Sequence, residues 1–473
     1  MQVDVVVVGG GIAGLAAAWR LHCRGIDVLV LESESEAGGN IRSAEVEGFR
    51  LERGPHNFMA SAEDVFTLAS EVEIDDEIVP TSAAAEARFI VRGGRLHQVP
   101  SGLWSGLTTG LLSFGAKLKL ATEPFRLQRG QPDDTAKQFF DRRFGEEASR
   151  MLAGAFINGV YAGDPAILSA PAAFPLFWGF EQETGSMVRG MMRLQKSRAA
   201  ARKALGEQAP PRRSGLYSMR LGLGQLTGAI ARKLGARVRT NHPVTGLQRT
   251  ATGWAVRVHN QIIDCRRLVL ACPPPQAARL LTGIDDGMAR SLREIPMAKV
   301  AMICLGYRQR LGEVPDGYGF LAPRGEGCRL LGVLFPSRLF DGRTPKGGDL
   351  LAAFVGGMLD AEALELDDAA LTRLVRDDLK KLLELDAEPS MVRVARYPAA
   401  IPQLVRGHLE RVVELRQRAR TLGSLWLAGN YLHGVGIKDA VRSGFEVALD
   451  LAEHDPVAAT PARPTLILQE VRP

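Results

Sequence analysis

The sequence predicts an α/β protein of several domains. At the N-terminus, a β-rich run, a glycine-rich turn and an apolar helix follow one another within the first 25 residues. Near the C-terminus, a strand, a glycine-bearing loop and a helix follow in the same order between residues 425 and 454. Between these ends, residues from about 110 to 208 have a mainly helical pattern. Alternating strands and helices are typical of parallel sheets that are covered by helices.

The composition excludes several classes of protein. The chain has 473 residues, enough for two to four domains at roughly 100–200 residues each. Hydrophobic residues make up 46% and charged residues 24%, which excludes a disordered or collagen-like chain. The net charge of +6 is a small surplus. Such a surplus is either solvated surface or, where it clusters, a site for an anionic partner.

The cysteines and the N-terminus indicate a cytoplasmic protein. Five cysteines in a chain of this length, the closest pair being Cys265 and Cys272, do not indicate a disulfide framework. No His or Cys cluster has metal-ligand spacing, so we expect buried, reduced thiols and no metal site. The N-terminus lacks the basic region and cleavage site of a signal peptide. No run of about 18 apolar residues is present to span a bilayer.

The first 32 residues predict a dinucleotide-binding site in a Rossmann-like fold. Residues 3–8 form a strand, residues 15–25 a helix, and residues 27–31 a second strand that is followed by Glu32. Glu32 lies where a carboxylate accepts both ribose hydroxyls. In the G-x-G-x-x-G turn, Gly9 allows the tight turn, Gly11 lets a pyrophosphate approach the helix N-terminus, and Gly14 lets the helix pack on the sheet. The complete turn comprises Gly9, Gly10, Gly11, Ile12, Ala13 and Gly14.

The residues that follow favour FAD over NAD, which the turn alone does not distinguish. Gly38-Gly39-Asn40 and the nearby Arg42 resemble the second glycine doublet of the flavin amine oxidase and protoporphyrinogen oxidase superfamily. In that superfamily the doublet lies against the pyrophosphate and the flavin. Members often have arginine where this chain has Glu36, so we assign Glu36 no role and leave the phosphates to backbone amides and Arg42. A surface position is the alternative for Arg42.

The C-terminal strand, loop and helix are expected to hold the flavin end of the cofactor. Asn430 follows the strand, and Val435, Gly436 and Ile437 precede the helix. Free backbone amides and a helix N-terminus suit the electron-rich N1–C2=O edge of a flavin and favour its reduction. An ordinary joint between a strand and a helix is the alternative.

The expected FAD-binding domain is discontinuous in the chain. A helix from residue 224 to 234 and short strands at 237–239, 254–259 and 268–272 form a further part of it. In related flavoproteins the residue that matches Val244 contacts the adenine through its backbone. We expect residues 1–85, 215–295 and 400–473 to form the FAD-binding domain. Residues 86–109 and 296–399 then form a mixed-sheet, α+β substrate-binding domain, and residues 110–214 a helical, membrane-binding domain.

Motifs along nearly the whole chain resemble the oxygen-dependent protoporphyrinogen oxidase family. Residues 48–58 (GFRLERGPHNF) are similar to its G-x-x-x-E-x-G-P-x-x-F segment, in which the glycine and proline lie against the flavin. Residues 88–100, 158–169, 401–408 and 425–440 resemble further motifs of this family. The candidate cofactor-binding residues of the first segment are Gly54, Pro55, His56 and Asn57. The chain departs from the family pattern at His56, Leu404, Lys438 and Ala440. We expect these departures to change the fine tuning of the site more than the class of reaction.

The resemblance implies a set of substrate-binding residues. Arg88 pairs with a propionate, for which a guanidinium is well shaped. The backbone carbonyl of Gly159 faces the substrate and polarises a pyrrole N–H. The apolar walls are formed by Leu321, Leu334 and Phe354. Without the resemblance we would favour core packing for these three residues and a surface position for Arg88.

The activity that the resemblance implies is oxidation of protoporphyrinogen IX to protoporphyrin IX by non-covalently bound FAD. Three hydride transfers to flavin N5 remove six electrons, and O₂ reoxidises the flavin to give hydrogen peroxide. The chemistry lies in the cofactor, and no catalytic side chain is required. The alternatives are a relative that oxidises coproporphyrinogen, an amine oxidase or a carotenoid-desaturase-type enzyme. A catalytically silent FAD-binding protein is disfavoured because no part of the flavin site is deleted.

A basic segment beside an apolar one predicts a membrane surface as partner. Residues 165–180 carry no charge and are rich in aromatic residues. The cations that follow are Arg189, Arg193, Lys196, Arg198, Arg202, Lys203, Arg212 and Arg213. This pattern suits an anionic membrane, although a solvated helix is equally compatible with it. We expect peripheral attachment to the inner face of the cell membrane, no nucleic-acid partner because no recognition module is present, and a homodimer as an open alternative.

Overall fold

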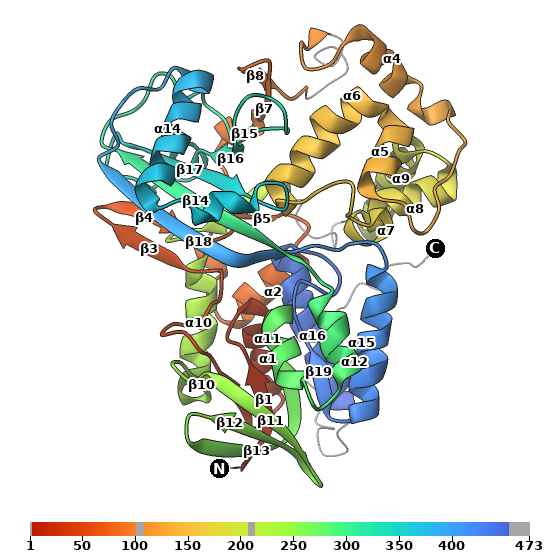
Figure 1. Cartoon of the computed structure of the whole chain (residues 1–473), viewed down its shortest axis with the longest axis vertical. Helices are drawn as coiled ribbons and strands as arrows, with labels where there is room; N and C mark the ends of the chain where they lie inside the picture. The colour runs from red at the N-terminus through yellow and green to blue at the C-terminus, as the bar shows by residue number, and fades with distance from the viewer. Residues whose placement is uncertain (1, 101–107, 207–212, 454–473) are drawn as a thin grey trace.

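The computed structural model describes residues 2–100, 108–206 and 213–453. The molecule is elongated, with one large sheet and its helices in the lower half of Figure 1. A second large sheet lies in the upper half, beside a group of helices that runs from α4 to α9. The predicted α/β fold is confirmed, and the domain boundaries given above stay predictions.

The lower sheet combines segments from three separate parts of the chain. Its strand order is β10–β2–β1–β13–β12–β11, and β19 pairs with β13. The strands from β10 to β13 run parallel, as does β19, whereas β12 and β11 are antiparallel additions. The strands are β1 (Gln2–Val8), β2 (Val28–Leu31), β10 (Val238–Arg239), β11 (Val244–Thr250), β12 (Gly253–Val258), β13 (Gln261–Leu270) and β19 (Leu425–Leu427).

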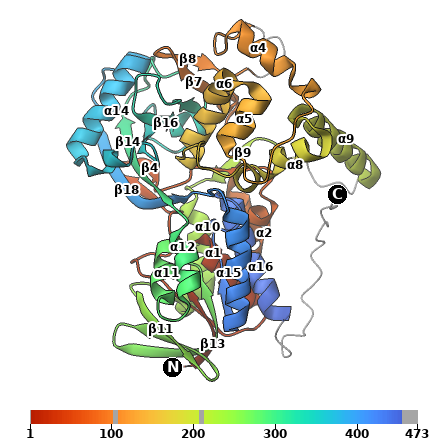
Figure 2. The same cartoon turned by 45° about the vertical axis from the view of Figure 1, so that its right-hand side comes forward.

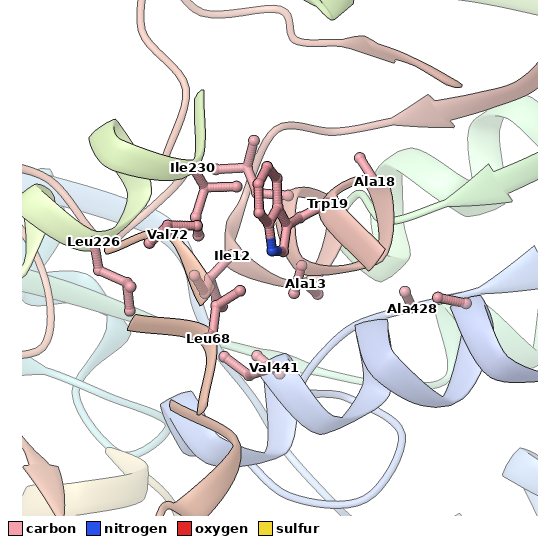
Figure 3. Packing of buried hydrophobic residues seen from close by; sticks show 14 of the residues in the cluster. Ile12, Ala13, Ala18, Trp19, Leu68, Val72, Leu226, Ile230, Ala428 and Val441 are labelled. Atoms are coloured by element: carbon pink, nitrogen blue, oxygen red, sulfur yellow. The ribbon is translucent and has the colours of Figure 1, made fainter. Parts of the chain in front are cut away.

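Helices from distant parts of the chain cover this sheet. Apolar side chains of α1, α2, α10 and α16 meet in one core, in which Trp19 lies among the neighbours shown in Figure 3. The helices α11, α12 and α15 contribute to a second core with the sheet. The helices are α1 (Ile12–Cys23), α2 (Glu63–Glu71), α10 (Gly224–Leu234), α11 (Pro274–Leu281), α12 (Asp286–Arg293), α15 (His408–Leu422) and α16 (Ile437–Glu453).

The upper sheet is mixed and has helix α14 (Asp368–Leu383) packed on one face. Its strand order is β18–β14–β17–β16–β15–β7–β8, with β15 and β7 as the parallel pair. The other face turns toward Phe49 and Leu51 of the short strand β4 (Phe49–Glu52). The strands are β7 (Phe89–Arg92), β8 (Arg95–Gln98), β14 (Met297–Tyr307), β15 (Gly319–Leu321), β16 (Leu330–Leu334), β17 (Asp349–Gly356) and β18 (Met391–Pro402).

Two small sheets and several short helices complete the fold. The pair of β3 and β4 forms one small sheet, and β5, β9 and β6 form another. The strands are β3 (Ser43–Val46), β4 (Phe49–Glu52), β5 (Phe58–Met59), β6 (Ile78–Pro80) and β9 (Leu216–Met219). The short helices are η1 (Asp75–Glu77), η2 (Ala83–Glu86), η7 (Gly235–Arg237), α13 (Pro336–Leu339) and η8 (Ala361–Glu365).

The helical part has its own aromatic core. In it, Phe140 packs edge to face against both Phe139 and Phe174. Residues 168–174 of the uncharged stretch 165–180 are buried, whereas Leu176 is half exposed. The elements are α4 (Phe114–Ala121), η3 (Glu123–Phe125), α5 (Ala136–Phe144), α6 (Glu146–Ala148), η4 (Ser149–Gly154), η5 (Ile157–Tyr161), α7 (Ala170–Ala173), α8 (Pro175–Thr184) and α9 (Met187–Leu205).

Two sequence expectations concern the whole molecule. All five cysteines are free thiols, but only Cys265 and Cys304 are buried as expected, whereas Cys272 and Cys328 are half-buried and Cys23 is exposed. Among the described residues, no helix combines the length and the apolar character that crossing a bilayer requires.

Candidate active site

The glycine-rich turn between β1 and α1 has the geometry of an anion site. Gly9 has a φ of +108°, and a Cβ there would lie 2.9 Å from the Ala271 carbonyl oxygen. A Cβ on Gly14 would lie 2.1 Å from the Gly9 oxygen, so the turn and α1 pack only with glycine at this position. A Cβ on Gly11, in contrast, would meet no atom within 4 Å. The N-terminus of α1 therefore faces open space, with no acidic residue in its first turn and no side-chain cap.

Glu32 holds the turn in place. Its side chain is buried, and its Oε2 accepts a hydrogen bond of 2.7 Å from the Gly10 N–H. The other oxygen accepts from the Glu34 N–H at 2.9 Å. Each carboxylate oxygen has further lone pairs, so the group can still accept from a ligand hydroxyl. The backbone oxygen of Glu32 accepts from the His242 N–H at 2.7 Å, which brings the segment that leads to Val244 to the same end of the sheet.

The second glycine doublet packs directly on the first turn. The Gly38 N–H donates to the Gly10 oxygen at 2.7 Å, and a Cβ on Gly39 would lie 3.2 Å from the Gly11 Cα. A Cβ on Gly54 would lie 2.1 Å from the Asn40 oxygen, so the segment 54–57 is fixed against the doublet. Arg42 is half-buried, and its Nε has no hydrogen-bond partner among the described residues.

The C-terminal loop reaches the same region in front of α16. Ile437 packs on the core that contains Ile12 and Ala13 of α1. The Asn430 side chain donates to the Val435 oxygen at 3.3 Å and shapes the loop. One detail differs from the expectation of free amides, because the Gly436 N–H donates to Asp439 Oδ2 at 3.0 Å.

The strand register of the upper sheet places the three apolar candidates on one face. Leu321 of β15 and Phe354 of β17 both pair with Gly332 of β16, so their side chains flank a residue without one. Leu334 lies two residues further along β16 and points to the same side. A Cβ on Gly159 of η5 would lie 2.3 Å from Leu321 Cδ2, so the helical part approaches this face closely.

Arg88 borders the same face. It is exposed and lies two residues before Ile90, which pairs with Leu321. Its guanidinium carbon lies 5.5 Å from the centre of the Tyr318 ring, and no carboxylate among the described residues pairs with it. The cation is therefore available to an anionic ligand.

His56 joins the cofactor segment to the apolar face. Its ring is 6% exposed and meets the Phe354 ring edge-on, with 6.1 Å between centroids. Burial, and to a smaller extent the positive charge of Arg343, lowers the pKa of His56 from 6.5 to about 3, so the ring is neutral. Its Nε2 has no partner among the described residues, which is costly for a buried polar atom unless a ligand supplies one.

Sequence analysis missed the charged groups beneath this junction. Glu52 is buried, accepts from Ser43 Oγ at 2.6 Å, and lies 3.7 Å from Arg343 Nη2. Burial raises the pKa of Glu52 despite the nearby guanidinium. The glutamate belongs to the segment 48–58, so its motif position was the signal available, whereas Arg343 lies in no motif.

Two surface hollows lie away from this junction. One, of about 660 Å³, lies between α14 and β18, and the other, of about 760 Å³, lies beside α5. None of the predicted site residues lines either hollow. We therefore place the candidate site by the convergence of the cofactor segments and the apolar sheet face.

Comparison with known proteins shows the family to which the chain belongs. A family model described as flavin containing amine oxidoreductase matches residues 12–452. The chain belongs to this family. It is a flavoprotein oxidoreductase, and the open space at Gly11 and the unpartnered His56 Nε2 fit a bound flavin nucleotide.

The similar proteins within and around this family include porphyrinogen oxidases. The chain is 31% identical to the chloroplastic protoporphyrinogen oxidase of Nicotiana tabacum, over 95% of this chain and 85% of that protein. It is 27% identical to the coproporphyrinogen III oxidase of Bacillus subtilis (strain 168), over 93% and 96%. A crystal structure from Exiguobacterium sp. 255-15, provisionally assigned as a protoporphyrinogen oxidase, has a TM-score of 0.82 at 24% identity, with 95% and 98% covered. That last likeness shows the fold alone.

Proposed function

We propose that the chain binds FAD non-covalently and uses O₂ to oxidise protoporphyrinogen IX to protoporphyrin IX. The observation that carries the proposal is the shared face of Leu321, Leu334 and Phe354, which meets the cofactor segment at His56 and is bordered by Arg88. An apolar face with one cation at its edge suits a large apolar ring system that carries carboxylates. The porphyrinogen oxidases among the similar proteins support this choice.

The cofactor-binding residues of the proposal come from three parts of the chain. The turn at Gly11 and the N-terminus of α1 bind the pyrophosphate, Glu32 binds the ribose, and the backbone near Val244 contacts the adenine. The segments 38–42 and 54–57 and the loop 430–437 lie along the flavin end. When bound, FAD supplies a two-electron acceptor that O₂ regenerates with release of hydrogen peroxide.

The protein's own residues bind and orient the substrate. Leu321, Leu334 and Phe354 remove water from the reacting face, and the Phe354 ring provides a surface for a pyrrole. Arg88 pairs with a propionate and sets the ring's position along the sheet. The Gly159 carbonyl accepts from a pyrrole N–H and favours loss of electron density from the neighbouring carbon.

The direct test is turnover by the purified holoprotein with both porphyrinogens. Under air, the proposal expects porphyrin fluorescence to rise with three molecules of hydrogen peroxide formed per porphyrin, faster from protoporphyrinogen than from coproporphyrinogen. The relative from Bacillus subtilis makes coproporphyrinogen the second candidate, and a reversed preference would select it. Amine oxidation without porphyrin formation would refute both.

We propose further that the helical part attaches to the inner face of the cell membrane in the cytoplasm. Four exposed apolar side chains form what we call the apolar edge: Phe114, Leu118, Phe125 and Leu127, which are 57–83% exposed. The exposed basic helix α9 lies at the same end of the molecule (Figure 2). Buried Glu123 of η3 accepts from the Met187 N–H at 2.8 Å and so fixes the start of α9 beside this edge. Of the predicted cations, Arg212 lies outside the described residues.

Vesicle sedimentation tests this attachment. The proposal expects binding to phosphatidylglycerol vesicles at low salt, weaker binding at high salt, and little binding to phosphatidylcholine. Replacing Phe114 and Phe125 together by serine should release the protein, whereas Val413→Ser, at an exposed apolar position of α15, should not. No binding to anionic vesicles at low salt would refute the proposal.

A further inference from the structure

A hydrogen bond between two side chains joins the cofactor segment to the substrate sheet. Asn57 Nδ2 donates to the Tyr318 hydroxyl oxygen at 2.8 Å across the boundary between the two halves. Asn57 follows His56, and Tyr318 immediately precedes β15, the strand that carries Leu321. The hydroxyl of Tyr318 is thereby held at the junction described above.

The surroundings of Tyr318 leave its ring little freedom. Its backbone N–H donates to the Ala87 oxygen at 2.8 Å, and its backbone oxygen accepts from the Phe335 N–H at 3.1 Å. The ring packs against the small cluster of Ala85, Leu339 and Phe340. Because the hydroxyl group is already held in place, little conformational entropy is lost when a ligand forms a hydrogen bond with it.

The hydroxyl proton of Tyr318 is available for a further hydrogen bond. Because Asn57 uses the oxygen as an acceptor, the O–H remains a donor, and no acceptor for it lies among the described residues. Burial raises the pKa of Tyr318, although Asn57 and Arg88 act in the opposite direction. The group is therefore protonated at neutral pH and able to donate.

Arg88 adds a positive charge beside this donor. Its guanidinium carbon lies 5.5 Å from the centre of the Tyr318 ring, at the distance of a cation–π contact. The ring supports the exposed arginine from one side, and Ala87, which precedes the arginine, is bonded to the tyrosine backbone. The cation and the neutral donor thus belong to one rigid unit, and a carboxylate accepts from both kinds of group.

We propose that Tyr318 is a further substrate-binding residue, which donates to the same substrate carboxylate that Arg88 binds and positions that arginine. This inference rests on the proposed function. It assigns Asn57 the task of orienting the tyrosine hydroxyl. A porphyrinogen would then be held by one carboxylate at two points, directly beside the segment that contacts the flavin.

The test measures the affinity of the flavin-loaded protein for protoporphyrin IX, with the fluorescence of the porphyrin as the signal. Tyr318→Phe keeps the ring and should weaken binding about tenfold, the usual effect of losing a hydrogen bond to a charged group. Its effect should largely disappear in the Arg88→Ala background, because both residues hold one carboxylate. The dimethyl ester of the porphyrin should bind to Tyr318→Phe and to the wild type with the same affinity. In turnover, KM should rise while kcat stays within about twofold.

Two further variants separate binding from general structural effects. Asn57→Ala leaves the donor in place but frees its orientation, so it should weaken binding less than Tyr318→Phe does. Tyr307→Phe makes the same change on the opposite face of the upper sheet, under α14, and should leave binding unchanged. If Tyr318→Phe and the wild type bound protoporphyrin IX with equal affinity, this inference would be overturned, but the proposed function would not. A wild-type holoprotein that binds no porphyrin would overturn the proposed function as well.

Discussion

Gly444 of α16 lies directly against Ala13 of α1. A Cβ on Gly444 would come within 2.3 Å of the Ala13 carbonyl oxygen and 2.9 Å of the Ala17 nitrogen. These two helices begin at Ile437 and Ile12, next to the two loops that we propose hold opposite ends of FAD. The close contact therefore fixes the distance between the pyrophosphate site and the flavin edge.

Gly444→Ala should force the two helices apart. We expect a loss of about 1–3 kcal/mol in unfolding free energy, as for other overpacked cores, together with a lower content of retained flavin. Chemical denaturation and the flavin absorbance of the purified protein measure the two effects. Gly179→Ala in α8 is the matched control, because a Cβ there meets no atom within 4 Å. That control should be neutral or stabilise the protein by roughly 0.5–1 kcal/mol.

Arg88→Ala should impair substrate use without affecting the cofactor. We expect KM for the porphyrinogen to rise about tenfold or more, since a hydrogen-bonded ion pair with a carboxylate is lost. Flavin content should stay at the wild-type level because Arg88 lies outside the cofactor segments. Arg95→Ala, at an exposed position of the neighbouring strand β8, should behave like the wild type. Unchanged kinetics in Arg88→Ala would remove the propionate role.

His56 should make stability depend on pH. Its pKa is lowered to about 3 in the folded protein, so the unfolded chain takes up the proton first as the pH falls below 6.5. The stabilisation is complete above that pH and is lost progressively toward acid. Between pH 6 and pH 5, the wild type should lose about 1 kcal/mol more than His56→Asn. Denaturation curves at both pH values measure the difference, and an equal loss of stability in the two proteins would contradict this role of His56.

Arg143 should be essential to the helical part. It is fully buried, with its Nε 2.6 Å from Glu181 Oε1 and its Nη1 3.5 Å from Glu123 Oε1. Arg143→Ala leaves two buried carboxylates without this partner and should cost about 3–5 kcal/mol. Because Glu123 also fixes the start of α9, vesicle binding should fall in parallel. Arg310→Ala, which removes an exposed pair with Asp316, should cost less than about 1 kcal/mol.

The parts of the site that were predictable are local in the chain. Gly9 and Gly14 belong to the turn itself, and Glu32 follows 22 residues after Gly10 at the end of the next strand, so their spacing alone indicates their tasks. Around the lower sheet, the sequence also indicates the strands β1, β2, β10, β12, β13 and β19 and the helices α1, α10 and α16, but not β11, α2, α11, α12 or α15. The resemblance to a known family added the apolar face, which the register of β15, β16 and β17 then brought together.

The parts that were not predictable depend on contacts between distant segments. Gly444 is an unremarkable glycine in a helix until α16 packs on α1. Asn57 and Tyr318 are 261 residues apart, and no pattern in either segment indicates a hydrogen bond between them. The ion pairs of Arg143 combine three segments of the helical part, and charge patterns do not show which charges become buried. Such pairings arise only when the chain is folded.

The most direct measurement of the central claim is anaerobic mixing of the purified, flavin-loaded protein with protoporphyrinogen IX. If the apolar face and the flavin segment form one site, the yellow flavin absorbance should bleach within the mixing experiment, and admitting air should restore it as porphyrin fluorescence appears. Bleaching should be much slower in Arg88→Ala at low substrate concentration. A flavin that stays oxidised in the presence of excess protoporphyrinogen, while an amine substrate reduces it, would contradict the account.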